Sequence, residues 1–174
     1  VPMEVRNKLG KQVVDAVRKL GYQSAGTVEF LLDEDGSYYF IEMNTRIQVE
    51  HPVTEFVTGL DIVKEQISIA AGEPLRFTQE DIRFSGHSIE CRINAEHPET
   101  FRPSPGLITA YNPPGGPGIR VDSSVYQDYV VSSHYDSLVA KLISYGSDRR
   151  EALSRMNRAL DMFIIEGIDT SIPV

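Results

Sequence analysis

One short segment of this chain carries chemically capable side chains at every second position. They are an acid, an amide, a guanidinium, a second amide and a second acid: Glu42, Asn44, Arg46, Gln48 and Glu50. Alternate side chains of an extended chain share one face, so these five would lie on one side of a strand, backed by mostly apolar residues. Carboxylate and amide oxygens bind divalent cations, a guanidinium binds an anion, and a carboxylate can accept a proton. The segment therefore predicts a binding or catalytic site rather than an ordinary solvated strand face.

A predicted hairpin brings a further acid to this segment. Residues 25–32 and 37–42 have the composition of strands, and the Asp35-Gly36 dipeptide between them is a strong signal for a two-residue turn. A loop of that length sets the register so that Glu29 lies directly opposite Glu42. The alternative is a longer turn that shifts the register and leaves both acids in solvent.

The predicted pair of acids favours a metal site. Two facing carboxylates destabilise a strand pair, and a divalent cation between them would reverse that effect. Asn44 adds a third oxygen on the same face as Glu42. Two or three oxygen ligands with open positions suit Mg²⁺, which proteins commonly share between carboxylates and substrate phosphates. We therefore predict Glu29, Glu42 and Asn44 as metal ligands.

The later residues of the segment cannot reach the same metal in a straight strand. Eight residues of strand span roughly 26 Å, and the His51-Pro52 pair argues against a regular central strand. We therefore predict that the chain bends after Asn44 and forms a second pocket beside the metal. There Arg46 and Gln48 could bind an anion, and Glu50 could act as a general base. A surface ion pair between Arg46 and Glu50 is the alternative.

The surrounding elements predict an α+β fold. One helix starts at Pro2 and stops at Gly21, and Asp61 caps a second helix that ends at Gly72. A last helix starts at Asp148. The first helix places its apolar residues on one face: Val5, Leu9, Val13, Val17 and Leu20. The last helix has a similar stripe: Leu153, Met156, Leu160 and Phe163. Four stretches between these helices read as strands: 87–95, 107–111, 119–121 and 138–144.

Composition narrows the class of protein further. The chain has 174 residues and a net charge of −8, which argues against a broad nucleic-acid-binding face. No apolar run is long enough for a membrane span, so no membrane partner is expected. Its one cysteine, Cys91, cannot form an internal disulfide, and its alternation with isoleucines predicts a buried core residue. A polar connection near residue 80 suggests two domains, 1–80 and 81–174.

Several motifs resemble those of one enzyme family. Residues 40–54, FIEMNTRIQVEHPVT, resemble the signature of biotin carboxylases, which belong to the ATP-grasp superfamily. Residues 86–96, GHSIECRINAE, resemble the second signature of that family. Three shorter motifs follow in the family's order: PSPG at 103–106, PGG at 114–116 and YDS at 135–137. The similarity covers nearly the whole chain, and the run RIQVEHP is not expected in a carbamoyl phosphate synthetase or a D-alanine ligase.

The resemblance implies a fold and a reaction. The fold would be the C-terminal part of an ATP-grasp domain followed by a mainly antiparallel lobe. The reaction would be the ATP- and bicarbonate-dependent carboxylation of biotin through carboxyphosphate, with Mg²⁺ or Mn²⁺ on the ATP phosphates. The matching positions are Glu29, Glu42 and Asn44 for the metal; Arg46, Gln48 and the backbone N–H of Val49 for bicarbonate; Glu50 for its proton; and Leu31 for the adenine pocket.

Arg92, in the second signature, is the remaining candidate. It shares a strand face with Glu90, Asn94 and Glu96, so a structural Glu–Arg pair is one interpretation. The resemblance instead places Arg92 beside the ureido ring of biotin. Deprotonation makes that ring an enolate-like anion, and a fixed guanidinium would stabilise the developing charge. Glu50, Arg92 and Arg46 are therefore the expected catalytic residues.

The resemblance also implies a larger assembly. The expected partners are a biotinylated carrier domain and a carboxyltransferase, with a homodimer in the cytoplasm, or in the mitochondrial matrix of a eukaryote. The family's glycine-rich phosphate loop, ATP-binding lysines and N-terminal domain would lie before Val1, so we expect a fragment with half of an active site. Two alternatives stay open: an ATP-grasp ligase that activates another carboxylate, and a non-catalytic homologue that serves as an assembly surface. The final acyl acceptor and the role of Asp136 are undecided.

Overall fold

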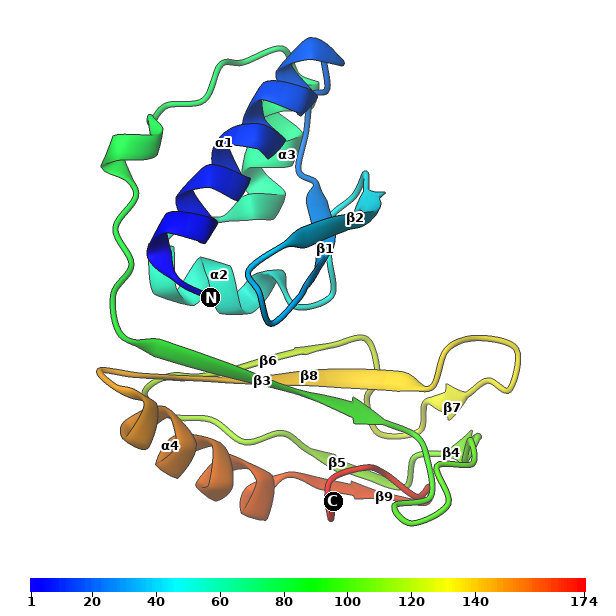
Figure 1. Cartoon of the computed structure of the whole chain (residues 1–174). Coiled ribbons are helices and arrows are strands. Elements are labelled where there is room, and N and C mark those ends of the chain that lie inside the picture. The colour runs from blue at the N-terminus through cyan, green and yellow to red at the C-terminus, as the bar shows by residue number, and fades with distance from the viewer. The chain divides into compact units, whose positions relative to one another are not determined.

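The computed structural model describes all 174 residues, which divide into two compact units. The first unit contains Val1–His51 and Leu60–Ile82, and the second contains Pro52–Gly59 and Arg83–Val174. Both contain helices and antiparallel strands, so the predicted α+β class is confirmed (Figure 1). None of the helices combines the length and the apolar character needed to cross a lipid bilayer.

The first unit is a helix and a hairpin with a second helix beside them. Its elements are α1 (Met3–Lys19), β1 (Thr27–Leu32), β2 (Tyr38–Asn44), α3 (Ile62–Ala70) and a 3-10 turn at Gln79–Asp81. The helix α1 follows Pro2, whose fixed φ suits a first helical turn. Asp61 caps α3 by accepting a hydrogen bond of 2.9 Å from the backbone N–H of Lys64, as predicted.

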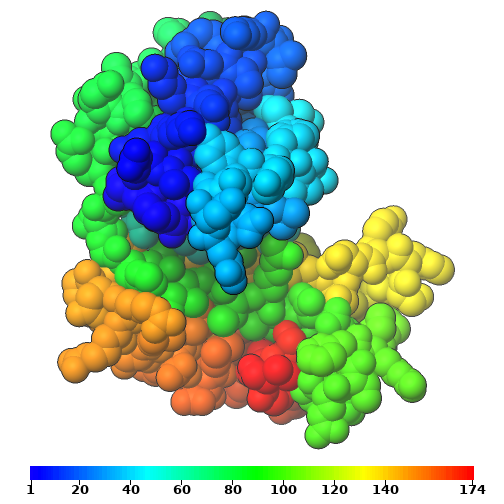
Figure 2. Space-filling model, viewed as in Figure 1, coloured from blue at the N-terminus to red at the C-terminus, as the bar shows by residue number.

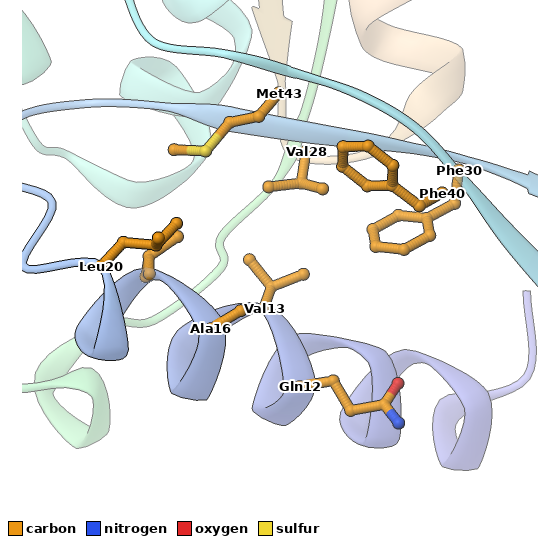
Figure 3. Close-up of a pocket in the computed structure, with 9 residues that line it drawn as sticks. Gln12, Val13, Ala16, Leu20, Val28, Phe30, Phe40 and Met43 are labelled. Carbon is orange, nitrogen blue, oxygen red and sulfur yellow. The ribbon is translucent and has the colours of Figure 1, made fainter.

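The apolar face of α1 is turned toward the hairpin. Figure 3 shows the resulting apolar hollow, of about 360 Å³, between the helix and the two strands. Its lining residues are Val13, Ala16, Val17 and Leu20 from the helix end and Val28, Phe30, Phe40 and Met43 from the strands, with Gln12 at the rim. No residue of this unit is fully buried, and Phe40 is 65% exposed. The unit therefore presents its hairpin without a closed core of its own.

The second unit is built on a three-stranded antiparallel sheet of order β3-β8-β6. Helix α2 spans His51–Thr58, and its residues from Pro52 on belong to this unit. The other elements are β3 (His87–Asn94), β4 (Gly106–Leu107), β5 (Ala110–Asn112), β6 (Ile119–Ser123), β7 (Val130–Val131), β8 (Leu138–Gly146), α4 (Arg149–Met162) and β9 (Ile164–Glu166). The helix α4 covers one face of the sheet (Figure 1), and Met156 and Phe163 pack there with Ile93 and Leu142 into a closed core. Cys91 was predicted to be a buried core residue, but it is only partly buried and packs against this core. This burial, with the charge of Glu90, raises the pKa of its thiol.

One strand of this unit was predicted wrongly, and two others were not predicted. The predicted strand 107–111 is two short strands, β4 and β5, which pair with β7 and β9 in separate sheets. The chain turns between them because Ile108 is drawn completely into the core. Neither β7 nor β9 was predicted, since segments this short carry no periodic pattern. In Figure 2 the yellow segment around β7 stands out from the surface of this unit. The predicted stripe of α4 is confirmed for Met156 and Phe163, which lie in the core, and for Leu160, which packs against it. Ala152 and Ala159 are buried on the same helix as well.

Candidate functional site

The hairpin that carries the acids has a longer loop than predicted. Asp33 accepts a hydrogen bond of 3.1 Å from Gly36 N–H, and its own N–H donates to Ser37 over 2.8 Å, so three residues form the loop. Gly36 has φ of +85°, which this turn requires and which glycine adopts without strain. The longer loop shifts the register near the turn, where Phe30 pairs with Phe40. The prediction of a two-residue loop was therefore wrong.

A bulge at Ile41 restores the predicted pairing of the acids. The register changes between Glu29 and Phe30, so Ile41 has no partner and Glu29 lies opposite Glu42. A register error of one residue would have moved one acid to the apolar face. With the bulge, Phe40 and Met43 both face α1, and Glu42 keeps the opposite side. The pairing of Glu29 with Glu42 was predicted correctly, although for an incomplete reason.

Two carboxylates and one amide meet on this opposite face. The Asn44 amide nitrogen donates to Glu29 Oε1 at 2.9 Å and to Glu42 Oε1 at 3.3 Å. Glu29 Oε1 also accepts a hydrogen bond of 3.1 Å from Gln48 Nε2. Glu29 therefore joins the predicted metal ligands to Gln48, one of the predicted anion-binding residues.

The chain bends after Asn44, as predicted, because β2 ends there. Arg46 uses its planar fork inside the bend: Nη2 donates to Asn44 Oδ1 and Nη1 donates to the carbonyl of Ile47, both over 3.1 Å. The turn then closes on itself, since His51 contacts the carbonyl of Gln48 through its backbone N–H at 3.3 Å and through Nδ1 at 2.7 Å. The segment thus runs as a compact curl into the first turn of α2.

The other predicted residues of this region lie around the curl. Val49 is half-buried and Glu50 is exposed, and both stand in the turn before α2. Leu31, on β1, is 63% exposed and pairs with Tyr39 across the hairpin. The structure therefore brings five of the predicted residues into one hydrogen-bonded network: Glu29, Glu42, Asn44, Arg46 and Gln48.

The network fits a hard divalent cation of the kind that is shared with a substrate. The chain has no cluster of three or more His, Cys, Asp or Glu side chains, so a cation here would have two carboxylates, one amide oxygen and ligands from elsewhere. Asn44 directs its nitrogen, not its oxygen, at the acids. Binding a cation would require the amide to rotate, and that rotation would release Arg46 from Asn44 Oδ1. Asn44 thus contacts both predicted acids through its nitrogen and Arg46 through its oxygen.

Arg92 lies on the face of the β3-β8-β6 sheet that α4 does not cover. It stands opposite Lys141 on β8, and Lys141 stands opposite Asp122 on β6, so the three share one face. Its neighbour Asn94 donates from Nδ2 to Glu96 Oε1 at 3.4 Å, while the buried Asn94 Oδ1 accepts no hydrogen bond. Ser137 Oγ donates a short hydrogen bond to the same Glu96 oxygen. Arg92 itself is exposed on this face.

Helix α2 is anchored on the same face, and sequence reasoning missed the anchor. Arg120 Nη1 lies 2.6 Å from Glu55 Oε2 on α2, while its Nε and Nη2 bind both oxygens of Asp122 at 2.7 and 2.8 Å. The Glu55 side chain is only 9% exposed. The Phe56 ring also stacks on Tyr145 with centroids 5.7 Å apart. The one available signal was the alternation of Arg120 with Asp122 on a predicted strand.

The charged groups of this anchor shift the pKa of Asp122. Burial alone would raise the pKa of Asp122, but the hydrogen bonds and positive charge of Arg120 outweigh it. Lys141, whose Nζ lies 3.5 Å from Asp122 Oδ2, acts in the same direction. The pKa of Asp122 is therefore below its ordinary value, and this carboxylate stays charged at neutral pH.

Two family models together account for almost the whole chain. Residues 1–78 match the ATP-binding domain of the carbamoyl-phosphate synthase L chain, and residues 90–174 match the biotin carboxylase C-terminal domain. The order of the two matches, an ATP-binding domain followed by a biotin carboxylase C-terminal domain, defines the class of protein. The chain belongs to the biotin carboxylase family.

The relatives are longer proteins. A biotin carboxylase of Allochromatium vinosum is 60% identical over 97% of this chain, which covers 37% of that protein. A biotin carboxylase of Haemophilus influenzae is 58% identical over 98% of this chain, which covers 38% of it. The biotin carboxylase domain dimer of Hydrogenobacter thermophilus 2-oxoglutarate carboxylase, solved with MgADP, ADP and bicarbonate, has a TM-score of 0.94 at 56% identity. The chain covers 38% of that structure's chain, and the match includes 99% of this one.

Proposed function

We propose that the full-length protein carboxylates biotin with ATP and bicarbonate, through carboxyphosphate, as the biotin carboxylase component of a biotin-dependent carboxylase. The observation that carries this proposal is the single network in which Glu29 joins Asn44 to Gln48. Phosphorylation of bicarbonate needs a cation on the nucleotide phosphates beside an anion-binding pocket, and the network links groups suited to each. The relative that was solved with MgADP and bicarbonate supports the same pair of ligands.

In this proposal the acids of the hairpin bind the metal. Glu29, Glu42 and Asn44 would hold Mg²⁺ or Mn²⁺, which would supply positive charge to the ATP phosphates during transfer. Glu29 and Glu42 already converge on one Asn44 nitrogen, so little movement of the acids is needed. Leu31, exposed on the neighbouring strand, would contribute an apolar contact to the adenine base.

Bicarbonate would bind in the curl between β2 and α2. Arg46 presents a planar fork, Gln48 is oriented by Glu29, and the Val49 N–H lies in the same turn. Glu50, next in the chain, would accept the proton of bicarbonate, which makes the anion a better nucleophile toward the terminal phosphate of ATP.

Arg92 would act on the second substrate. Transfer of the carboxyl group to biotin creates negative charge on the ureido ring, and an exposed guanidinium can stabilise that charge. Lys141, opposite Arg92, adds positive charge to this face. The same face carries the Glu55–Arg120 ion pair that anchors α2.

The proposal extends to the arrangement of the whole protein. We propose an ATP-grasp portion at residues 1–80 and a biotin carboxylase C-terminal domain at 81–174. The full-length protein would form a homodimer and work with a biotinylated carrier domain and a carboxyltransferase. It would act in the cytoplasm, or in the mitochondrial matrix of a eukaryote, where the thiol of Cys91 stays reduced.

The test uses the purified full-length protein. We expect ATP cleavage that requires bicarbonate, rises with free biotin and incorporates labelled bicarbonate into biotin. Glu42→Gln should raise the Mg²⁺ concentration needed for half-maximal rate while leaving thermal stability near that of the wild type, because it also relieves a pair of facing acids. ATP cleavage driven by a different carboxylate acid, with no response to bicarbonate or biotin, would favour another ATP-grasp ligase.

A further inference from the structure

The strand that carries Arg92 has an unusual outer edge. β3 is an edge strand of the β3-β8-β6 sheet, so one side of its backbone has no neighbouring strand. The pairing with β8 is also irregular here, because the register changes between Ile93 and Asn94. Backbone next to a bulge on an edge strand is held by fewer ladder bonds than backbone in the centre of a sheet. Arg92 therefore stands next to an irregular point of an edge strand.

A single residue from the end of the chain occupies this edge. Ser171 Oγ donates to the carbonyl of Arg92 at 3.2 Å and accepts from the N–H of Asn94 at 3.0 Å. Its backbone N–H donates to the carbonyl of Asn94, also at 3.0 Å. Three hydrogen bonds from one serine thus take the place of the missing strand on either side of Ile93, which is itself fully buried.

We propose that Ser171 is a positioning residue for Arg92: it fixes the backbone from which the guanidinium projects and acts on biotin carboxylation only through Arg92. This inference rests on the proposed function. A long side chain retains many rotamers when it is exposed, so the direction of the Arg92 Cα–Cβ bond sets what its guanidinium can reach. A small displacement of a charge-stabilising group is costly to rate, even when the group itself remains.

The test first compares three single variants of the full-length protein with the wild type. Ser171→Ala removes both side-chain hydrogen bonds and keeps the backbone one, and we expect about a five- to tenfold fall in kcat for carboxylation of free biotin. Bicarbonate-dependent ATP cleavage without biotin should stay within about twofold of the wild-type rate. Ser171→Thr keeps the hydroxyl and should restore most of the carboxylation rate. Ser104→Ala is the matched control, because Ser104 Oγ tethers Asp169 of the same terminal segment at 3.0 Å but does not touch β3.

A double variant separates positioning from general loosening. If Ser171 acts through Arg92, Ser171→Ala should cost nothing further in an Arg92→Ala background. Equal losses in Ser171→Ala and Ser104→Ala, or equal losses in both half-reactions, would overturn the inference and leave Ser171 a structural residue. If Arg92→Ala itself does not reduce biotin carboxylation, the failure lies in the proposed role of Arg92. If Arg92→Ala is slow but Ser171→Ala is normal, only the role of Ser171 is refuted.

Discussion

Replacing Glu29 by two different residues should separate its two functions. Glu29 Oε1 accepts hydrogen bonds from Asn44 Nδ2 at 2.9 Å and from Gln48 Nε2 at 3.1 Å. Glu29→Gln loses the charge but retains an acceptor oxygen at the same reach, whereas Glu29→Ala loses both. Either variant should weaken the response to Mg²⁺ by at least about tenfold, because one of two carboxylates near the metal is gone.

The two variants should differ in their use of bicarbonate. Glu29→Ala also releases Gln48, and one lost hydrogen bond of about 1–1.4 kcal/mol corresponds to about a five- to tenfold increase in the KM for bicarbonate. Glu29→Gln should change that KM by less than about twofold. The assay is bicarbonate-dependent ATP cleavage at saturating Mg²⁺ and ATP, with Glu34→Gln on the exposed hairpin loop as the control. An equal increase in both variants would refute the link from Glu29 to Gln48.

The remaining predictions concern three other positions. Arg92→Ala should cut biotin carboxylation about 10²–10³-fold and spare most bicarbonate-dependent ATP cleavage, because its charge is needed in only one half-reaction; equal damage to both would assign it elsewhere. Glu50→Gln should lower both rates together while nucleotide affinity, measured by titration, stays near the wild-type value; a collapse of affinity would exclude a role as the bicarbonate base. Asp122→Asn should destabilise the protein most at neutral pH. Because the pKa of Asp122 is lowered in the folded state, the ionised carboxylate stabilises the fold at pH values above its ordinary pKa of 3.8. This stabilisation is lost as the pH falls through the folded-state pKa. Thermal unfolding from pH 7 to pH 3 should therefore show the gap between wild type and variant closing in acid, and a gap that widens would contradict the reasoning.

The pairing of Glu29 with Glu42 was predictable from sequence because two departures from the predicted hairpin, a longer loop and a bulge, cancel each other. Asp35-Gly36 signals a tight turn, but Asp33 starts that turn one residue earlier and adds a residue to the loop. The bulge at Ile41 then cancels the shift. Nothing in the local composition marks Ile41 as a bulge. What selects it is the packing of Phe40 and Met43 against α1, which a strand-by-strand reading does not consider.

The residues that support the site were harder to predict than those that form it. Arg46 and Gln48 belong to a local pattern, so their neighbours in the chain indicate their role. Ser171 and Arg120 act on residues that are distant in sequence, and each has an ordinary composition around it. Short strands such as β9 likewise depend on pairing with a distant partner rather than on periodicity. Such contacts become visible only when the topology is known.

The proposed function requires that ATP phosphorylate bicarbonate at the Glu29 network. The most direct measurement supplies the full-length protein with bicarbonate labelled with ¹⁸O and determines the label in the inorganic phosphate that is released during biotin carboxylation. Transfer through carboxyphosphate leaves one bicarbonate oxygen on the phosphorus, so we expect singly labelled phosphate in step with carboxybiotin. Unlabelled phosphate, whose fourth oxygen comes from water, released while biotin is carboxylated would contradict transfer through carboxyphosphate.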